Sequence, residues 1–151
     1  MNYKAVRDGI AAFVSSLPLP VISGSITVSS VFAPEVELED KKGTTIEVFI
    51  VSAAISKSER KEDQRTRTAR VLIRHRLVGE SMAARVTEEN AYDQLVNDLE
   101  KKLVRYVSSD GEAAAQSVEV PVFIEGAQYY QEGVLSSIID VEVLNFEPAA
   151  D

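Results

Sequence analysis

The hydrophobic positions at the start of the chain repeat at the spacing of an α-helix. This pattern predicts a helix over residues 2–16, with the charged side chains off the apolar stripe. The stripe consists of Tyr3, Val6, Ile10, Phe13, Val14 and Leu17. Pro18 and Pro20 end the helix, because proline lacks a backbone donor and disfavours helical geometry in the preceding residue. Residues 21–32 follow as either a strand or an extended connection.

Alternation with a period of two predicts a long β-hairpin in the first half of the chain. Residues 45–55 and 67–78 read as its strands, and the polar residues 56–66 read as its loop. In the second strand Ala69, Val71, Ile73, His75 and Leu77 share one face, and Arg70, Leu72, Arg74, Arg76 and Val78 share the other. Residues 35–39 alternate as a short, half-exposed strand, and residues 40–43 have the composition of a tight turn.

A second amphipathic helix is predicted over residues 88–107. Thr87 serves as its N-cap, and the acidic residues that follow suit the first turn, where the helix dipole favours anions. Its apolar stripe is Tyr92, Leu95, Val96, Leu99, Leu103 and Tyr106. The polar residues 108–111, which end in glycine, terminate the helix.

The remaining pattern predicts strands near the C-terminus. Residues 118–125 alternate, but Pro121 cannot donate to a ladder, so this strand belongs at a sheet edge or carries a bulge. Residues 128–136 read as a loop or a short turn of helix, residues 137–146 as a final strand and residues 147–151 as a tail. The element order predicts one domain of 151 residues with an α+β fold: a mainly antiparallel sheet, a long charged hairpin and two helices packed on one face.

Composition limits the chemistry of the chain. It has no cysteine, which excludes a disulfide framework, a thiol nucleophile and a thiolate metal site. Its apolar runs are far shorter than the roughly 18 residues of a membrane-spanning helix, so no membrane contact is expected. The net charge of −8 disfavours general adhesion to nucleic acid.

The hairpin arm, residues 45–78, differs in charge from the rest of the chain. Residues 57–76 carry eight basic and three acidic side chains, while the remainder has 8 basic and 21 acidic residues. A basic arm on an acidic body predicts a contact between subunits. The candidate interface residues are Lys57, Arg60, Lys61, Arg65, Arg67, Arg70, Arg74 and Arg76.

Two other roles for these arginines compete with that prediction. They could form a cross-strand ladder within the chain, with Glu47, Glu119, Asp140 or Glu142 as partners. They could also bind phosphate. No aromatic residue alternates with them, which argues against a stacking platform for single-stranded nucleic acid.

Evidence for catalysis or metal binding is sparse. His75, the single histidine, lies on the apolar face of its strand, so a structural role is favoured over that of a base in a hydrolase or transferase. The carboxylates Glu35, Glu37, Glu39 and Asp40 could hold a divalent cation weakly, but a solvated strand face explains them better. Asp140 and Glu142 favour the same solvent-facing interpretation. The chain is predicted not to be an enzyme and to use no cofactor or metal.

The order of the helix at 2–16, the hairpin at 45–78, the helix at 87–106 and the strand at 137–143 resembles that of the small neck and tail proteins of tailed bacteriophages, in particular tail terminator (tail completion) proteins. The resemblance implies a hexameric ring in the virion, assembled in the host cytoplasm, that caps the tail tube and joins it to the head connector or stopper protein. DNA would pass through the ring without specific binding, and the basic hairpin would reach the acidic surface of a neighbouring subunit. The alternatives are another phage structural protein, such as a tail tube or head-completion protein, or a monomeric module that binds an acidic ligand through the basic strand.

Overall fold

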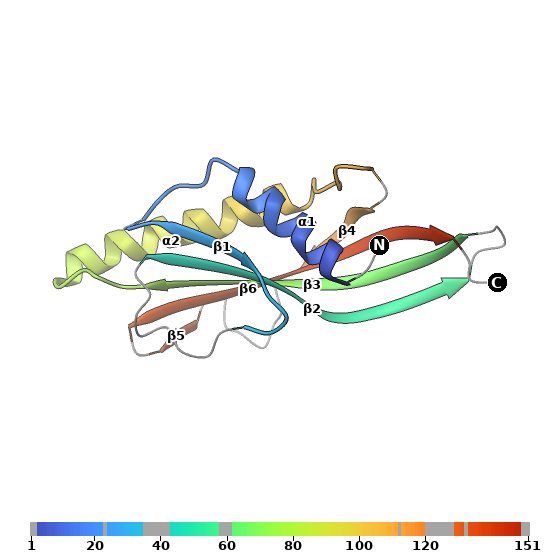
Figure 1. Ribbon diagram of the computed structural model, residues 1–151. Coiled ribbons are helices and arrows are strands. Elements are labelled where there is room, and N and C mark those ends of the chain that lie inside the picture. The colour runs from blue at the N-terminus through green and yellow to red at the C-terminus, as the bar shows by residue number, and fades with distance from the viewer. Residues whose placement is uncertain are drawn as a thin grey trace.

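The computed structural model describes residues 3–22, 24–34, 43–57, 62–111, 113–119, 129–131 and 133–148. These residues form two groups of elements, each with a helix followed by strands (Figure 1). In chain order the elements are α1 Tyr3–Ser16, β1 Ile26–Ser30, β2 Thr44–Lys57, β3 Glu62–Arg76, α2 Met82–Leu103, β4 Ala113–Glu119, β5 Tyr129–Gln131 and β6 Val134–Pro148.

The strands form one sheet in the order β1-β2-β3-β6-β4, and β5 pairs with the first residues of β6 beside this path. The pair β1–β2 is parallel, and the other pairs are antiparallel. Both helices lie on the same side of the sheet (Figure 1). The predicted fold class, α+β with a mainly antiparallel sheet covered by two helices, is confirmed.

The long hairpin is confirmed, and its strands are longer than predicted. β2 and β3 pair from Thr44↔His75 to Lys57↔Asp63. The prediction of a loop over residues 56–66 was wrong at both of its ends, which belong to β2 and β3. The reason is tertiary: β6 pairs along all of β3, and these ladder hydrogen bonds hold polar residues in strand geometry that composition alone does not favour. At about 3.3 Å per residue, strands of this length extend roughly 50 Å.

Helix α2 begins earlier than predicted and ends earlier. Its N-cap is Ser81, whose Oγ accepts a hydrogen bond from the backbone N–H of Ala84 at 3.1 Å. Thr87, the predicted N-cap, lies inside the helix and donates its hydroxyl to the Ala83 carbonyl. Ser81 caps as well as threonine does, and the residues after it are good helix formers, so the helix starts six residues earlier than predicted. The last helical residue is Leu103, and Val107 instead forms a β-bridge with Ala114.

The smaller strands correct several boundaries. Within residues 21–32, β1 is the strand, and the edge strand β4 begins at Ala113, ahead of the predicted segment 118–125. The predicted loop over residues 128–136 contains the β5–β6 hairpin, and β6 therefore starts before residue 137. The predicted strand at 35–39, the turn at 40–42, Pro121 and residues 149–151 fall outside the described residues.

The core lies between the helices and the sheet. α1 contributes Val6, Ile10 and Val14, and the whole predicted stripe of α2 is buried. The sheet supplies the alternate residues of its central strands: Ile46, Val48, Ala69, Val71, Ile73, Ile139, Val141 and Val143. The face of β3 that was predicted to be apolar is therefore the one that the helices cover, and the arginine-bearing face points away from them.

Candidate subunit interface

The arginines of β3 that face away from the helices have partners on both neighbouring strands. Arg70 stands opposite Asp140 of β6 and binds it with two hydrogen bonds, Nε to Oδ1 at 2.8 Å and Nη2 to Oδ2 at 3.0 Å. The hydrogen bond to Asp140 raises the pKa of Arg70. Arg74 forms an ion pair with Glu47 of β2, which is buried. The cross-strand ladder that competed with the interface prediction is therefore present for these two residues.

Arg67 lies on the other face of β3, among the residues that the helices cover, and is only 2% exposed. Its Nη1 donates to Oδ1 of Asn145 at 2.8 Å, and its guanidinium lies 5.0 Å from the ring centroid of Tyr3. Such a contact combines charge, stacking and hydrogen bonding in one buried side chain. Nothing in the local sequence singles out Asn145, because its partner lies 78 residues away.

The structure thus changes the picture of a basic arm. Arg67, Arg70 and Arg74 each bind a group of their own chain. Arg65 and Arg76 are partly buried. Lys57 is the last residue of β2, and Arg60 and Lys61 fall outside the described residues. A contact between subunits through this set stays a prediction, and it now depends on the residues near the hairpin tip.

His75 is completely buried and connects three elements. Its Nδ1 lies 2.9 Å from Oγ1 of Thr44 in β2, and its Nε2 lies 3.0 Å from Oε2 of Glu88 in α2. Because a carboxylate can only accept, Nε2 of His75 donates to Glu88. A hydroxyl, an imidazole and a carboxylate in this order resemble a catalytic triad. Thr44 is only 1% exposed, however, so the arrangement favours the structural role predicted for His75.

Glu88 also receives hydrogen bonds from the backbone N–H groups of Val78 and Gly79. Burial alone raises the pKa of Glu88, but the hydrogen bonds from His75 and these two backbone groups outweigh burial and hold the pKa below its usual 4.5. The sequence suggested a different role for Glu88, as an acidic residue of the first helical turn, where the helix dipole favours anions. Its buried position follows from the earlier start of α2.

The sheet has open strand edges at both ends of its path. β1 pairs with β2 only over Thr44–Val48, and the last bond runs from the backbone N–H of Val31 to the Val48 carbonyl at 3.0 Å. No strand in the described part of the chain pairs with the outer edge of β2 beyond that point. At the other end, β4 pairs with β6 on one side, and on its outer side the backbone groups of Ala113 and Ala115 bond Ser108 and Tyr106. Beyond Ala115 the outer edge of β4 meets no described strand. The sequence predicted an edge strand near β4 but gave no sign of the open half of β2.

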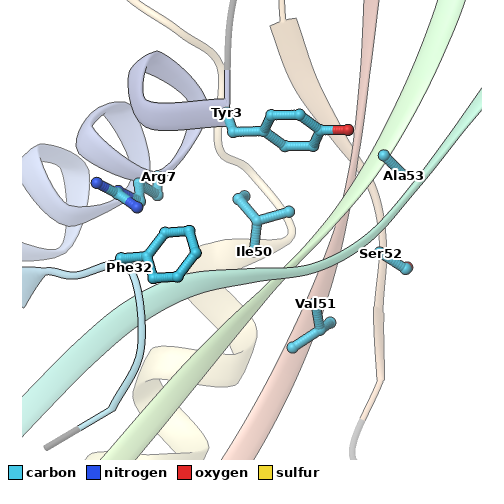
Figure 2. A pocket seen from close by; sticks show the side chains of 7 residues that line it. All are labelled: Tyr3, Arg7, Phe32, Ile50, Val51, Ser52 and Ala53. Atoms are coloured by element: carbon cyan, nitrogen blue, oxygen red, sulfur yellow. The ribbon is translucent and has the colours of Figure 1, made fainter.

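A groove of about 340 Å³ runs beside the open edge of β2 (Figure 2). It is lined by Tyr3 and Arg7 of α1, by Phe32 after β1, and by Ile50, Val51, Ser52 and Ala53 of β2. Two aromatic residues of this groove are exposed, Tyr3 at 52% and Phe32 at 88%. Val51 is the extra residue of a β-bulge and is exposed as well. An apolar groove next to unpaired backbone groups has the features of a protein-binding surface.

A second groove, of about 460 Å³, lies between the end of α1 and β1, and its lining includes Leu17, Leu19 and Ile26. Neither groove contains His75, Thr44 or Glu88. Among the described residues, no group of three or more metal-binding side chains comes together. The predicted carboxylate cluster at residues 35–40 falls outside the described part of the chain.

Comparison with known proteins yields no relative: no protein-family model matches the chain, and no curated protein sequence matches it. The helices in the described part of the chain are too short or too polar to cross a membrane.

Proposed function

We propose that this protein is a structural subunit of a tailed-bacteriophage neck or tail, a tail terminator-like protein that assembles into a ring. In this role it caps the tail tube and joins it to the head connector, and DNA passes through the ring without being bound. The observation that carries the proposal is the pair of partly open edges at opposite ends of one sheet, β2 beyond Val48 and β4 beyond Ala115. A subunit with two different binding edges associates head to tail, and such contacts close into a ring when the rotation fits.

Two further features support this proposal. The order of the long elements, from α1 through the β2–β3 hairpin and α2 to β6, is the order from which the resemblance to tail terminator proteins was drawn. The excess of acidic residues, with a net charge of −8, suits a ring through which DNA moves without adhering. A tail tube or head-completion protein would share these features. They therefore support a structural protein of the neck or tail, and the assignment to the tail terminator rests on the resemblance in element order.

The contacts of the arginines argue against the alternative, a monomeric module that binds an acidic ligand. Arg70 and Arg74, the residues expected to hold such a ligand, already bind Asp140 and Glu47. A ligand carboxylate would have to displace a partner that the chain holds in place without loss of association entropy.

Size-exclusion chromatography with light scattering, over a range of protein concentrations, tests the proposal. We expect a particle with several times the 16.5 kDa mass of the chain, and negative-stain images that show a ring with an open centre. A protein that stays monomeric at every concentration would contradict the proposal. Titration with double-stranded DNA at moderate salt provides the second readout, for which we expect no retention.

A further inference from the structure

The open half of β2 lacks most of the features that protect a free strand edge. Free edges are usually blunted by charge, by proline, by a bulge or by a covering segment, because their unpaired backbone groups recruit another strand. Apart from the bulge at Val51, residues 48–56 carry neither a charged side chain nor a proline. The groove beside this edge also exposes aromatic rings. The edge therefore has the composition of a strand that a partner covers.

Arg7 gives this groove a cation with an unsatisfied donor. Its Nε is buried and makes no hydrogen bond with any described residue. The adjacent carboxylate, Asp8, accepts instead from Lys4 at 2.7 Å. A guanidinium forms fork-shaped hydrogen bonds with carboxylates, and a buried donor without a partner is costly. The groove therefore fits an extended segment that combines an aromatic or apolar side chain with a carboxylate.

A segment of this chain has that composition. Residues 120–128, the connecting segment, read Val-Pro-Val-Phe-Ile-Glu-Gly-Ala-Gln and fall outside the described residues. They join Glu119 of β4, opposite Asp140, to Tyr129 of β5, opposite Ser136. The two ends are therefore four residues apart along β6, about 13 Å, whereas nine residues extend to about 30 Å. The connecting segment is longer than the path between its ends requires.

The connecting segment cannot reach the groove of its own subunit. A strand added outside β2 is four strand spacings from the edge at which β4 and β5 pair with β6, about 19 Å. A connection of nine residues with both ends fixed extends outward by only half of its length, about 15 Å. A neighbouring subunit is under no such restriction, so the connecting segment of a second copy is the occupant that fits.

We infer that residues 122–125 of a second copy lie antiparallel along the open half of β2, with Phe123 in the groove and Glu125 on Arg7. This inference rests on the proposed function, because it names the contact by which the ring closes head to tail. Three antiparallel pairings separate β2 from β4, so these strands run in opposite directions. A rotation about an axis along the strands preserves direction, so a segment that continues β4 meets β2 of the neighbour in antiparallel orientation.

The spacing of the side chains agrees with this orientation. Tyr3 and Arg7 are one turn of α1 apart, about 6 Å along the helix, and Tyr3 lies nearer to Ala53 (Figure 2). Phe123 and Glu125 are two residues apart, about 6.6 Å on the same side of a strand. The antiparallel orientation therefore brings Phe123 to Tyr3, and the carboxylate two residues later to Arg7. The groove of about 340 Å³ exceeds the roughly 150 Å³ cavity that holds a benzene ring, so it admits a phenyl side chain.

Charge complementation between variants tests this contact. Arg7→Glu and Glu125→Arg each place like charges in the groove, so each variant alone should assemble only at concentrations roughly 30-fold or more above those of the natural chain. In an equal mixture the two variants should assemble as the natural chain does, because each groove then meets a connecting segment of opposite charge when they alternate around the ring. The double variant should assemble for the same reason.

Two further variants serve as controls. Lys101→Glu makes the same change of charge at an exposed position of α2 and should leave assembly unchanged. Arg7→Gln removes the charge without reversing it and should raise the required concentration roughly 10-fold, so the test does not depend on how the fold tolerates the reversed charge. Light scattering measures the assembled mass, and circular dichroism checks the fold of each variant.

The outcomes separate this contact from the ring. Loss of assembly in both charge-reversed variants, with recovery in their mixture, supports the contact. Variants that assemble as the natural chain does overturn the inference and leave the proposed function standing. Loss without recovery in either the mixture or the double variant, while the natural chain still forms a ring, overturns the pairing of Glu125 with Arg7. A natural chain that is monomeric at every concentration overturns both the contact and the proposed function.

Discussion

Replacing Glu88 with alanine should destabilise the protein far more than replacing Glu89, its neighbour on the same helix. Glu88 joins the start of α2 to the end of β3, since its carboxylate accepts from His75, Val78 and Gly79. Glu89 is exposed. Both substitutions remove the same side chain from the same helix, so the difference between them measures the buried contacts.

The expected cost follows from which donors lose their partner. His75 is fully buried, so its Nε2–H would stay without a partner, at a cost of about 1–3 kcal/mol. Val78 is exposed and its backbone N–H can turn to water, so the two backbone bonds together contribute about 1 kcal/mol more. The sum is about 3 kcal/mol, a large part of the roughly 5–15 kcal/mol by which domains are stable.

Urea denaturation followed by circular dichroism measures the free energy of unfolding of each variant. We expect a clear drop in the midpoint for Glu88→Ala with an unchanged slope, and a change within about 0.5 kcal/mol for Glu89→Ala. Equal effects of the two substitutions would refute the assignment of a buried hydrogen-bonding role to Glu88.

The same carboxylate predicts a dependence on pH. The pKa of Glu88 is held below 4.5 in the folded protein, so the stabilisation from its charge is fully present above about pH 4.5. This stabilisation is lost as the pH falls through the folded pKa. The difference in unfolding free energy between the natural protein and Glu88→Gln should therefore shrink below pH 4.5, because glutamine does not titrate. A difference that stays constant from pH 7 to pH 3.5 would show that the charge contributes nothing.

Three further predictions follow from other contacts. A double-mutant cycle with Arg70→Met and Asp140→Ala should give a coupling energy of about 1 kcal/mol in urea denaturation, because the pair is bidentate and only partly exposed. A coupling energy near zero would show that this cross-strand ion pair does not stabilise the fold. Tyr92→Phe should cost about 1–2 kcal/mol, since the buried hydroxyl bonds the Ile73 carbonyl and Ser137, whereas Tyr3→Phe should be near neutral because the ring that Arg67 covers is retained. Gly79→Ala should destabilise the fold by about 1–3 kcal/mol and so lower the thermal midpoint, because the new Cβ would meet the Glu88 carboxylate at 2.8 Å and Ala84 at 2.9 Å. An unchanged midpoint would mean that this turn relaxes freely.

Charge reversal of Arg70 and Arg74 would not be a clean test of assembly. Each arginine faces a carboxylate of its own chain, so glutamate at these positions would place like charges together and weaken the fold itself.

The sequence by itself determined the elements whose periodicity is strong. The apolar stripe from Tyr92 to Leu103 of α2 and the alternation from Ala69 to His75 identified the buried faces, since the core selects apolar side chains at the spacing of each element. The sequence also supplied the possible partners of the arginines, Glu47 and Asp140, but it left open whether they or another molecule would bind them.

Only the tertiary structure decided which strands are neighbours. Pairing with β6 turned the polar residues 62–66 into strand, and the buried partners of His75 drew Glu88 into the interior. The open half of β2 and its alignment with β4 depend on rows of register partners that cross four strands. Local sequence does not encode such rows, because backbone hydrogen bonds between strands carry no side-chain identity.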